Sequence, residues 1–140
     1  MQDIIIKERP ASITCIFPST LLNVDKSVNA IKKFIIDKKI CCNLFELIYI
    51  LREALNNAVI HGNRNNDALQ VECTVALEHD KLSIVVSDHG TGFDWRAHLL
   101  KKKVPTDASS GRGIHSLSHY GFTVSYNESG NTLYLTKKII

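Results

Sequence analysis

The spacing of the apolar residues changes near residue 63, and this change constrains the fold more than any other feature of the chain. Between about residue 20 and this change, apolar residues recur every three or four positions, the period of an amphipathic helix. After it, they alternate with polar residues, the period of a strand. Because strands and helices are not interleaved one by one, a doubly wound sheet is excluded. The order predicts an α+β fold, a two-layer sandwich with a mixed, mostly antiparallel sheet and helices on one face.

Two helices are predicted in the first half of the chain. The first spans about 20–37, after Ser19 or Thr20 as N-cap, and its apolar positions are Leu22, Val24, Val28, Ile31, Phe34 and Ile35. The second is the clearest element and runs from residue 44 until Gly62 ends it. Its apolar stripe comprises Leu44, Leu47, Ile48, Leu51, Leu55, Ala58 and Val59.

The predicted strands precede and follow these helices in the sequence. They cover an edge strand at 3–6 and strands at 12–17, 69–77, 82–86, 122–126 and 132–136. The turn at His79–Asp80 makes a hairpin of the third and fourth strands. Residues 92–110 are polar and basic and predict an irregular segment, and a short helix is expected from about residue 111.

The composition narrows the class of protein. At 140 residues the chain predicts a single domain, 1–140. The net charge of +3 is small and the lysines are scattered apart from 101–103, so nucleic-acid binding is not predicted. No apolar run approaches the roughly 20 residues of a membrane span, and the N-terminus has too short an apolar core for a signal peptide. We expect a cytoplasmic protein without a membrane segment, whose four cysteines are reduced thiols.

Glu53 and Asn57 form a polar pair on the second predicted helix. Four residues apart, they share a face that lies roughly 180° to 220° around the helix from the apolar stripe. Such a pair is usually just solvated. However, Ile50 and Ile60 are predicted on the same side, and Asn57 is a weak helix former in a mid-helix position. An apolar-flanked polar pair suggests the wall of a pocket.

Asp88 interrupts an apolar strand face. The strand over 82–86 is predicted to bury alternate residues, and position 88 has the same parity but carries a carboxylate. This carboxylate could accept a hydrogen bond from the amino group of a ligand such as adenine, a bond worth about 1.5–3 kcal/mol. Gly90 and Gly92 would let the backbone approach the ligand closely. The alternative is that Asp88 only caps a turn, as Asp-x-Gly segments often do.

A third segment, SSGRGIHSL at 109–117, contains a Gly-x-Gly at a predicted helix start. Glycines there let backbone N–H groups converge on an anion, and the helix dipole assists. One Gly-x-Gly is weak evidence and also fits a plain loop. The combined order is more specific: Glu-x-x-x-Asn on a helix, Asp-x-Gly-x-Gly after a strand, then Gly-x-Gly opening a helix.

These segments resemble the motifs of a known superfamily, the GHKL (Bergerat-fold) ATPases. EALNNAVIHGN resembles their N box, DHGTGFD their first glycine box and SSGRGI their second. The short length, the opening FPST and the brief segment between the glycine boxes favour one subfamily. From about Ile13 to Lys137 the chain is similar to the anti-sigma-factor serine/threonine kinases of bacterial partner switching, the RsbW type.

The resemblance implies a role for each matching residue. Glu53 would be the catalytic general base, and Asn57 would hold Mg²⁺ between the phosphates of ATP or ADP, as a hard oxygen ligand suits that ion. Asp88 would bind adenine, with Gly90 and Gly92 beside it. The phosphate-binding turn would comprise Ser110, Gly111, Arg112, Gly113 and Ile114.

The resemblance also implies a function and partners. The protein would be an anti-sigma factor that sequesters a sigma factor, and a kinase that phosphorylates an anti-anti-sigma (STAS-domain) protein. A homodimer is expected, with residues 94–110 as the nucleotide lid. One position departs from the pattern: Ser109 stands where some members carry Arg, and Arg112 or a lysine of 101–103 could supply the missing charge.

Three other interpretations stay open from the sequence. The chain could be a non-catalytic ATP-binding docking module, the ATP domain of a histidine kinase, or an unrelated α+β domain whose glycines only form turns. The intact Glu53 disfavours the first, and no phospho-accepting histidine helix is seen before residue 44, which disfavours the second. His115 and His119 are spaced for a metal site, but no third ligand lies near them in the sequence.

Overall fold

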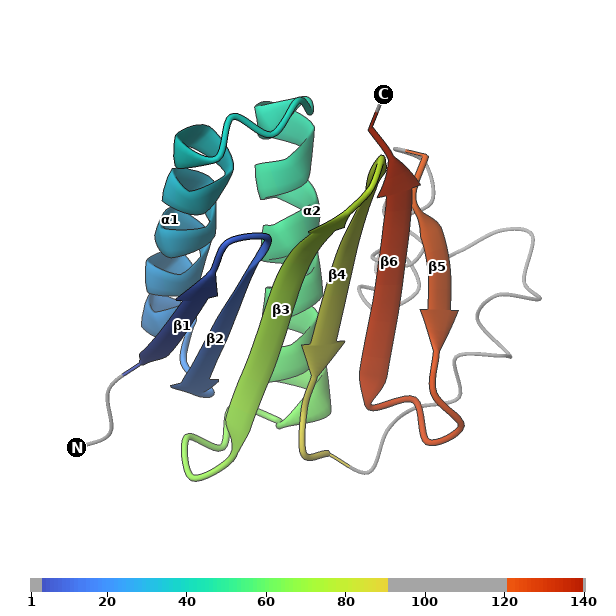
Figure 1. The fold of residues 1–140 in the computed structure, drawn as a ribbon. Coiled ribbons are helices and arrows are strands. Elements are labelled where there is room, and N and C mark those ends of the chain that lie inside the picture. Colours follow the sequence, from blue (N-terminus) through green and yellow to red (C-terminus); the bar gives the residue numbers. More distant parts are fainter. Residues whose placement is uncertain (1–3, 91–120, 140) are drawn as a thin grey trace.

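The structure, a computed structural model, describes residues 4–90 and 121–139. In that part of the chain, six strands form one antiparallel sheet in the order β1-β2-β3-β4-β6-β5, and the two α-helices cover one of its faces (Figure 1). The elements are β1 Ile5–Arg9, β2 Ser12–Pro18, α1 Leu21–Asp37, α2 Leu44–Asn57, the π-helical turn η1 Ala58–Gly62, β3 Gln70–Glu78, β4 Lys81–Ser87, β5 Thr123–Tyr126 and β6 Thr132–Lys138. The predicted α+β sandwich is confirmed, and every strand pair described is antiparallel.

Alternation along the strands divides the sheet into a core face and an outer face. Strand register places Cys15, Cys73, Val86 and Leu133 opposite one another in a row across β2, β3, β4 and β6, and all four are buried. Neighbouring positions carry hydroxyls on the outer face, where the Thr14 and Thr74 side chains are hydrogen-bonded at 2.9 Å. Apolar residues at every second position therefore fix the register, since a slip of one residue would bury the hydroxyls instead.

The helices pack their apolar stripes on the core face of the sheet. Thr20 caps α1 by accepting a hydrogen bond from the Asn23 backbone N–H, as the sequence predicts. Leu22, one of the apolar positions whose spacing predicted this helix, lies in α1 but is 65% exposed and is not part of the core. Asn23 is buried in the first turn instead, because its Nδ2 donates to the Pro18 carbonyl at 3.0 Å and satisfies the amide there.

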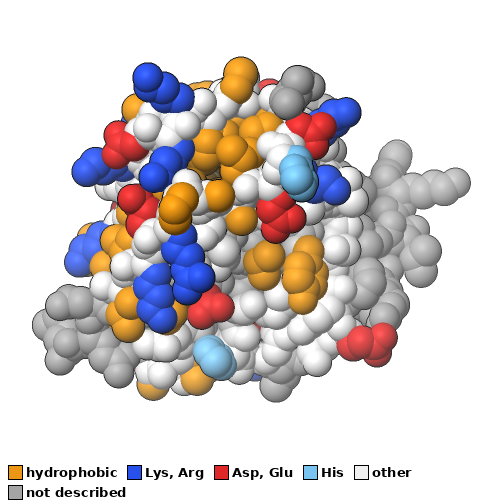
Figure 2. All heavy atoms as spheres, viewed as in Figure 1, with side chains coloured by type: hydrophobic (Ala, Val, Ile, Leu, Met, Phe, Trp, Pro, Cys, Tyr) orange, Lys and Arg blue, Asp and Glu red, His pale blue; other side chains and the backbone are white. Residues whose placement is uncertain are grey.

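Charges on the visible face of the molecule are mixed. Figure 2 shows Lys and Arg side chains interspersed with Asp and Glu, and apolar side chains between them. None of the helices in the described part of the chain is both long and apolar enough to cross a membrane.

All four cysteines are free thiols, but they differ in exposure. Cys15 and Cys73 are buried in the core, Cys42 is half-buried and Cys41 is exposed. Burial raises the pKa of Cys15 to about 11, and it also raises the pKa values of Cys42 and Cys73. Because the thiolate is the reactive form, burial slows reaction at Cys15, Cys42 and Cys73 both by shielding the sulfur and by raising its pKa, and Cys41 is the exposed thiol.

We therefore expect iodoacetamide at mildly alkaline pH to alkylate Cys41 first, Cys42 more slowly, and Cys15 and Cys73 only after unfolding. Peptide mass spectrometry over a time course would measure the four rates. Labelling in denaturant is the control, since all four thiols should then react at similar rates. Native-state alkylation of Cys15 or Cys73 as fast as that of Cys41 would contradict the packing described here.

Candidate functional site

Asp88 follows the end of β4 and lies where the loops after β4, after η1 and between β5 and β6 meet. Its backbone N–H donates to the Asn131 carbonyl at 2.9 Å, and its Oδ1 accepts from the Gly90 N–H at 2.8 Å. The turn-capping role that the sequence left open is therefore present. Burial raises the pKa of the Asp88 carboxyl above its ordinary value, although the Gly90 N–H and nearby His89 act in the opposite direction.

Gly62, at the end of η1, packs directly against this carboxyl group. A Cβ at position 62 would overlap the Asp88 carboxylate, and a Cβ at position 90 would overlap the Gly62 carbonyl group. From the sequence, Gly62 was predicted only to end the helix, and its contact with Asp88 was not predicted. The close backbone approach expected at Gly90 is made by the chain to itself, and it holds the end of the helical segment against the Asp88 turn.

We expect Gly62→Ala to destabilise the fold by about 1–3 kcal/mol, because the added methyl group must displace the Asp88 carboxylate. Urea denaturation would measure the change. The control is Gly62→Ala in an Asp88→Ala background, where the carboxylate that the new Cβ would overlap is absent, so the added destabilisation should largely disappear. A structure of Gly62→Ala with the Asp88 carboxylate unmoved and stability unchanged would refute the close approach.

The polar pair predicted on the second helix lies on α2, and both side chains are half-buried. The core side of α2 is formed by Leu47, Ile50, Leu51, Ala54 and Leu55. The prediction that Ile50 flanks Glu53 on the open side is wrong, because Ile50 is fully buried. Ile60 does remain partly exposed, at 37%. The exposed side of α2 is nevertheless not uniformly polar, because Phe45 and Tyr49 are also exposed there, at 81% and 37%.

Helix geometry orders these groups along one line. Gly62 contacts Asp88. At about 1.5 Å of rise per residue, Glu53 lies about 6 Å further back along α2 than Asn57, and the π-helical turn η1 separates Asn57 from Gly62. The π-helical turn η1 connects α2 to the following loop, and the Asn63 N–H donates to the Ala58 carbonyl at 2.8 Å. Such turns occur frequently at functional sites. An elongated ligand with one end at Asp88 would extend along α2 toward Glu53.

Two residues for which no role was predicted interact with Asp88 or its neighbour His89. Asn63 is 2% exposed, and its Oδ1 accepts from the His89 backbone N–H at 2.8 Å. Tyr126, at the end of β5, has a pKa raised by burial and by the negative charge of Asp88. Asn63 ends the N-box segment EALNNAVIHGN, but no role was predicted for it, and no motif includes Tyr126; their links to His89 and Asp88 are made only in the tertiary structure.

The donor set on α2 is compatible with magnesium held mainly by a ligand's phosphates. Glu53 and Asn57 offer hard oxygen donors, and Mg²⁺ commonly keeps several waters and takes only one or two protein ligands. No group of three or more His, Cys, Asp or Glu side chains that could hold a metal occurs in the described ranges 4–90 and 121–139.

Several predicted site residues lie outside the described residues. These are Gly92, Ser109, Ser110, Gly111, Arg112, Gly113 and Ile114, together with Lys101, Lys102, Lys103, His115 and His119. The described half of the candidate site therefore consists of α2, η1 and the segment from Asp88 to Gly90.

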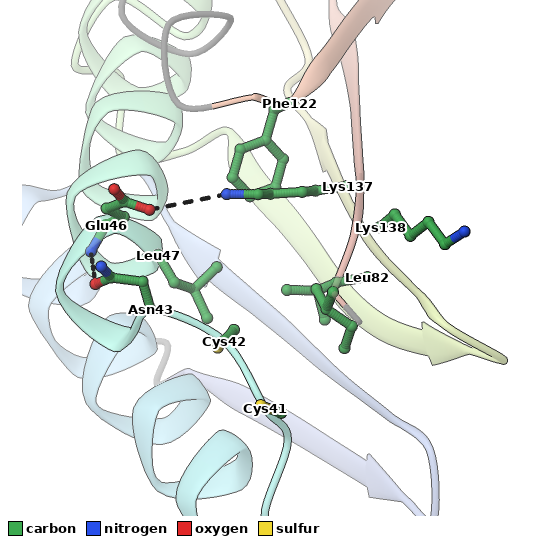
Figure 3. Close-up of a pocket in the computed structure, with 10 residues that line it drawn as sticks. Cys41, Cys42, Asn43, Glu46, Leu47, Leu82, Phe122, Lys137 and Lys138 are labelled. Carbon is green, nitrogen blue, oxygen red and sulfur yellow. Dashed lines mark hydrogen bonds and ion pairs between the residues drawn. The ribbon is translucent and has the colours of Figure 1, made fainter.

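A separate pocket of about 360 Å³ lies at the other end of the sandwich (Figure 3). It is bordered by the start of α2, including Glu46, by Leu82 at the start of β4 and by Lys137 near the end of β6. Lys137 Nζ is 3.8 Å from the Glu46 carboxylate and 5.5 Å from the centre of the Phe122 ring. Because Asp88 follows the opposite end of β4, this pocket is distinct from the candidate site.

Comparison with known proteins gives a consistent result. Residues 27–137 match the histidine kinase-like ATPase domain family. The anti-sigma F factor of Bacillus subtilis strain 168 is 31% identical over 103 residues, which cover 69% of this chain and 70% of that protein. The anti-sigma F factor of Bacillus thuringiensis strain Al Hakam is 33% identical over 101 residues, 67% of this chain and 68% of that protein. The anti-sigma F factor of Oceanobacillus iheyensis is 28% identical over 102 residues, with 69% and 70% coverage.

Proposed function

The chain belongs to the histidine kinase-like (GHKL) ATPases and, among them, to the anti-sigma-factor kinase family, and from this premise we propose a specific activity. The protein would transfer the γ-phosphoryl group of ATP to a serine or threonine of an anti-anti-sigma STAS-domain protein. In the alternative partner state it would bind and sequester a sigma factor. Residues 1–140 would act as one ATP-binding domain, in the cytoplasm and as a homodimer.

The observation that carries the proposal is the contact between Gly62 and the Asp88 carboxylate. It joins the end of the helical segment bearing Glu53 and Asn57 to a half-buried carboxylate, so that the three polar groups border one end of the sandwich. The family match implies ATP as the ligand. An adenine amino group at Asp88 would direct the phosphates along α2.

Each of the three residues would have a distinct task. The Asp88 carboxylate accepts a hydrogen bond from the adenine amino group and so selects the base. The Asn57 side-chain oxygen would be a ligand of Mg²⁺, which neutralises phosphate charge when bound. The Glu53 carboxylate orients the attacking hydroxyl and takes its proton, while ADP leaves with the electrons of the broken bond.

The proposal can be tested with purified protein, γ-labelled ATP, magnesium and a STAS-domain protein from the same organism. We expect label on a serine or threonine of the STAS-domain protein, located by mass spectrometry. A second assay measures binding of a sigma factor with and without the unphosphorylated STAS-domain protein, which should displace it.

A non-catalytic docking module is the competing function. That alternative predicts ATP binding and sigma-factor binding without transfer of label to any STAS-domain protein from the organism. Transfer that depends on magnesium excludes the docking module, and its absence with an intact nucleotide complex would exclude the kinase.

A further inference from the structure

Asn63 is a buried polar residue that joins four parts of the fold. Its Nδ2 donates to Ser19 Oγ at 2.7 Å and to the Gln70 carbonyl at 3.0 Å, while its Oδ1 accepts from the His89 N–H at 2.8 Å. Ser19 lies between β2 and α1, Gln70 begins β3, and His89 follows Asp88. The side chain of Asn63 therefore links the end of η1 to the backbone turn that carries the Asp88 carboxylate.

Asn131, in the β5–β6 connection, forms hydrogen bonds to the other side of the Asp88–Gly90 turn. The Asn131 carbonyl accepts from the Asp88 N–H at 2.9 Å, and its Nδ2 lies 3.4 Å from the Gly90 carbonyl. Asn131 is itself positioned by Asn127, whose Oδ1 accepts from the Asn131 N–H at 3.0 Å. The Asp88–Gly90 turn is thus held between two asparagines, and the bond from Asn63 is the one that reaches its middle residue.

Only an amide side chain makes all of the Asn63 bonds. A carboxylate could accept from the His89 N–H, but it would lose both donors and face the Gln70 carbonyl with a negative charge. An alanine would leave the His89 N–H and the Gln70 carbonyl without this partner. At 2% exposure, water cannot easily replace the lost bonds.

We propose that Asn63 is a positioning residue that sets the adenine specificity of the Asp88 carboxylate; this inference rests on the proposed ATP site. Guanine presents a carbonyl oxygen where adenine presents its amino group, so a fixed carboxylate attracts one base and repels the other. Without the Asn63–His89 bond the turn can relax, and the carboxylate can move away from a guanine carbonyl. Asn63 would then act on selectivity without touching the nucleotide.

The test compares Asn63→Ala and Ser19→Ala with wild-type protein. Calorimetry with ATP and with GTP gives the ratio of the two dissociation constants, and NMR gives the exchange rate of the His89 amide hydrogen. We expect Asn63→Ala to reduce the preference for ATP by about 2- to 10-fold, the range for one hydrogen bond, and to accelerate His89 exchange. Ser19→Ala removes one of the two donor contacts of Asn63, together with the Ser19 Oγ hydrogen bond to the Leu69 carbonyl, and should change both quantities in the same direction but less.

Asn66→Ala is the matched control, because Asn66 lies three residues further along the same loop and its Oδ1 accepts from the Ala68 N–H. It should leave the preference and His89 exchange unchanged. If Asn63→Ala does not fold, Ser19→Ala serves as the test: an unchanged preference for ATP in that variant would overturn the inference.

Two results would overturn this inference without affecting the proposed function. One is an equal loss of ATP and GTP affinity in Asn63→Ala, and the other is an unchanged preference despite faster His89 exchange. Wild-type protein that binds neither nucleotide would refute the proposed function itself, and the assignment of specificity with it.

Discussion

Replacing Glu53 by glutamine is expected to reduce phosphoryl transfer to the partner protein by about 100- to 10,000-fold, the usual contribution of a positioned general base. Glutamine keeps the size and hydrogen-bonding reach of the side chain but cannot take the proton of the attacking hydroxyl. ATP affinity should change by no more than about 2-fold, because Glu53 is proposed to contact the hydroxyl and not the base. The measurements are single-turnover transfer to the STAS-domain protein and calorimetric ATP binding.

Glu46→Gln is the matched control on the same helix. Glu46 lies in the first turn of α2, beside the separate pocket, and pairs with Lys137 at 3.8 Å. The variant should retain transfer, since its surface ion pair contributes little to stability. Equal losses in Glu46→Gln and Glu53→Gln would show that helix charge matters in general, and full activity in Glu53→Gln would remove Glu53 from the mechanism.

Asp88→Asn is expected to weaken ATP binding by about 10- to 150-fold, which corresponds to the 1.5–3 kcal/mol of a charge-assisted hydrogen bond. The asparagine Oδ1 can still accept from the Gly90 N–H, so the turn should keep its shape. The loss would therefore come from the missing charge and not from a displaced loop. Asp80→Asn, in the turn at the other end of β4, is the control and should bind ATP normally.

The same substitution should increase the stability of the nucleotide-free protein at neutral pH. Burial raises the folded-state pKa of Asp88 above its ordinary 3.8, so the folded protein binds this proton more tightly than the unfolded chain does. Ionised Asp88 consequently costs stability above its folded pKa, and that cost is relieved as the pH falls through the folded pKa toward 3.8. The stability gain of Asp88→Asn should therefore shrink over that window, as urea denaturation at several pH values would measure.

The sequence predicted the parts of the fold that depend on periodicity. The apolar stripe of α2 and the alternation in β3 and β4 each repeat over several residues. The spacing of apolar residues is therefore enough to predict these elements. The turn at His79–Asp80 was also predicted, and His79 adopts a positive φ of 57° there. Asp88 was recognised as a candidate because it places a carboxylate at a position where the alternation of this strand predicts a buried apolar residue.

What the sequence did not predict depends on contacts between distant segments. Ile50 was assigned to the open side of α2, but the width of the buried face is set by the sheet beneath it, and Ile50 is fully buried. Gly62 looked like a helix stop until the Asp88 carboxylate was found against it. Asn63 ends the N-box segment and begins a polar loop with several asparagines, and its linking role follows only from its hydrogen bonds to Gln70 and His89.

The most direct test of the account is a crystal structure of the protein with magnesium and a non-hydrolysable ATP analogue. We predict the adenine amino group within hydrogen-bonding distance of the Asp88 carboxylate, the metal at Asn57, and the terminal phosphate nearest Glu53. A nucleotide bound instead in the pocket beside Glu46 and Lys137, or an adenine that leaves the Asp88 carboxylate uncontacted, would contradict it.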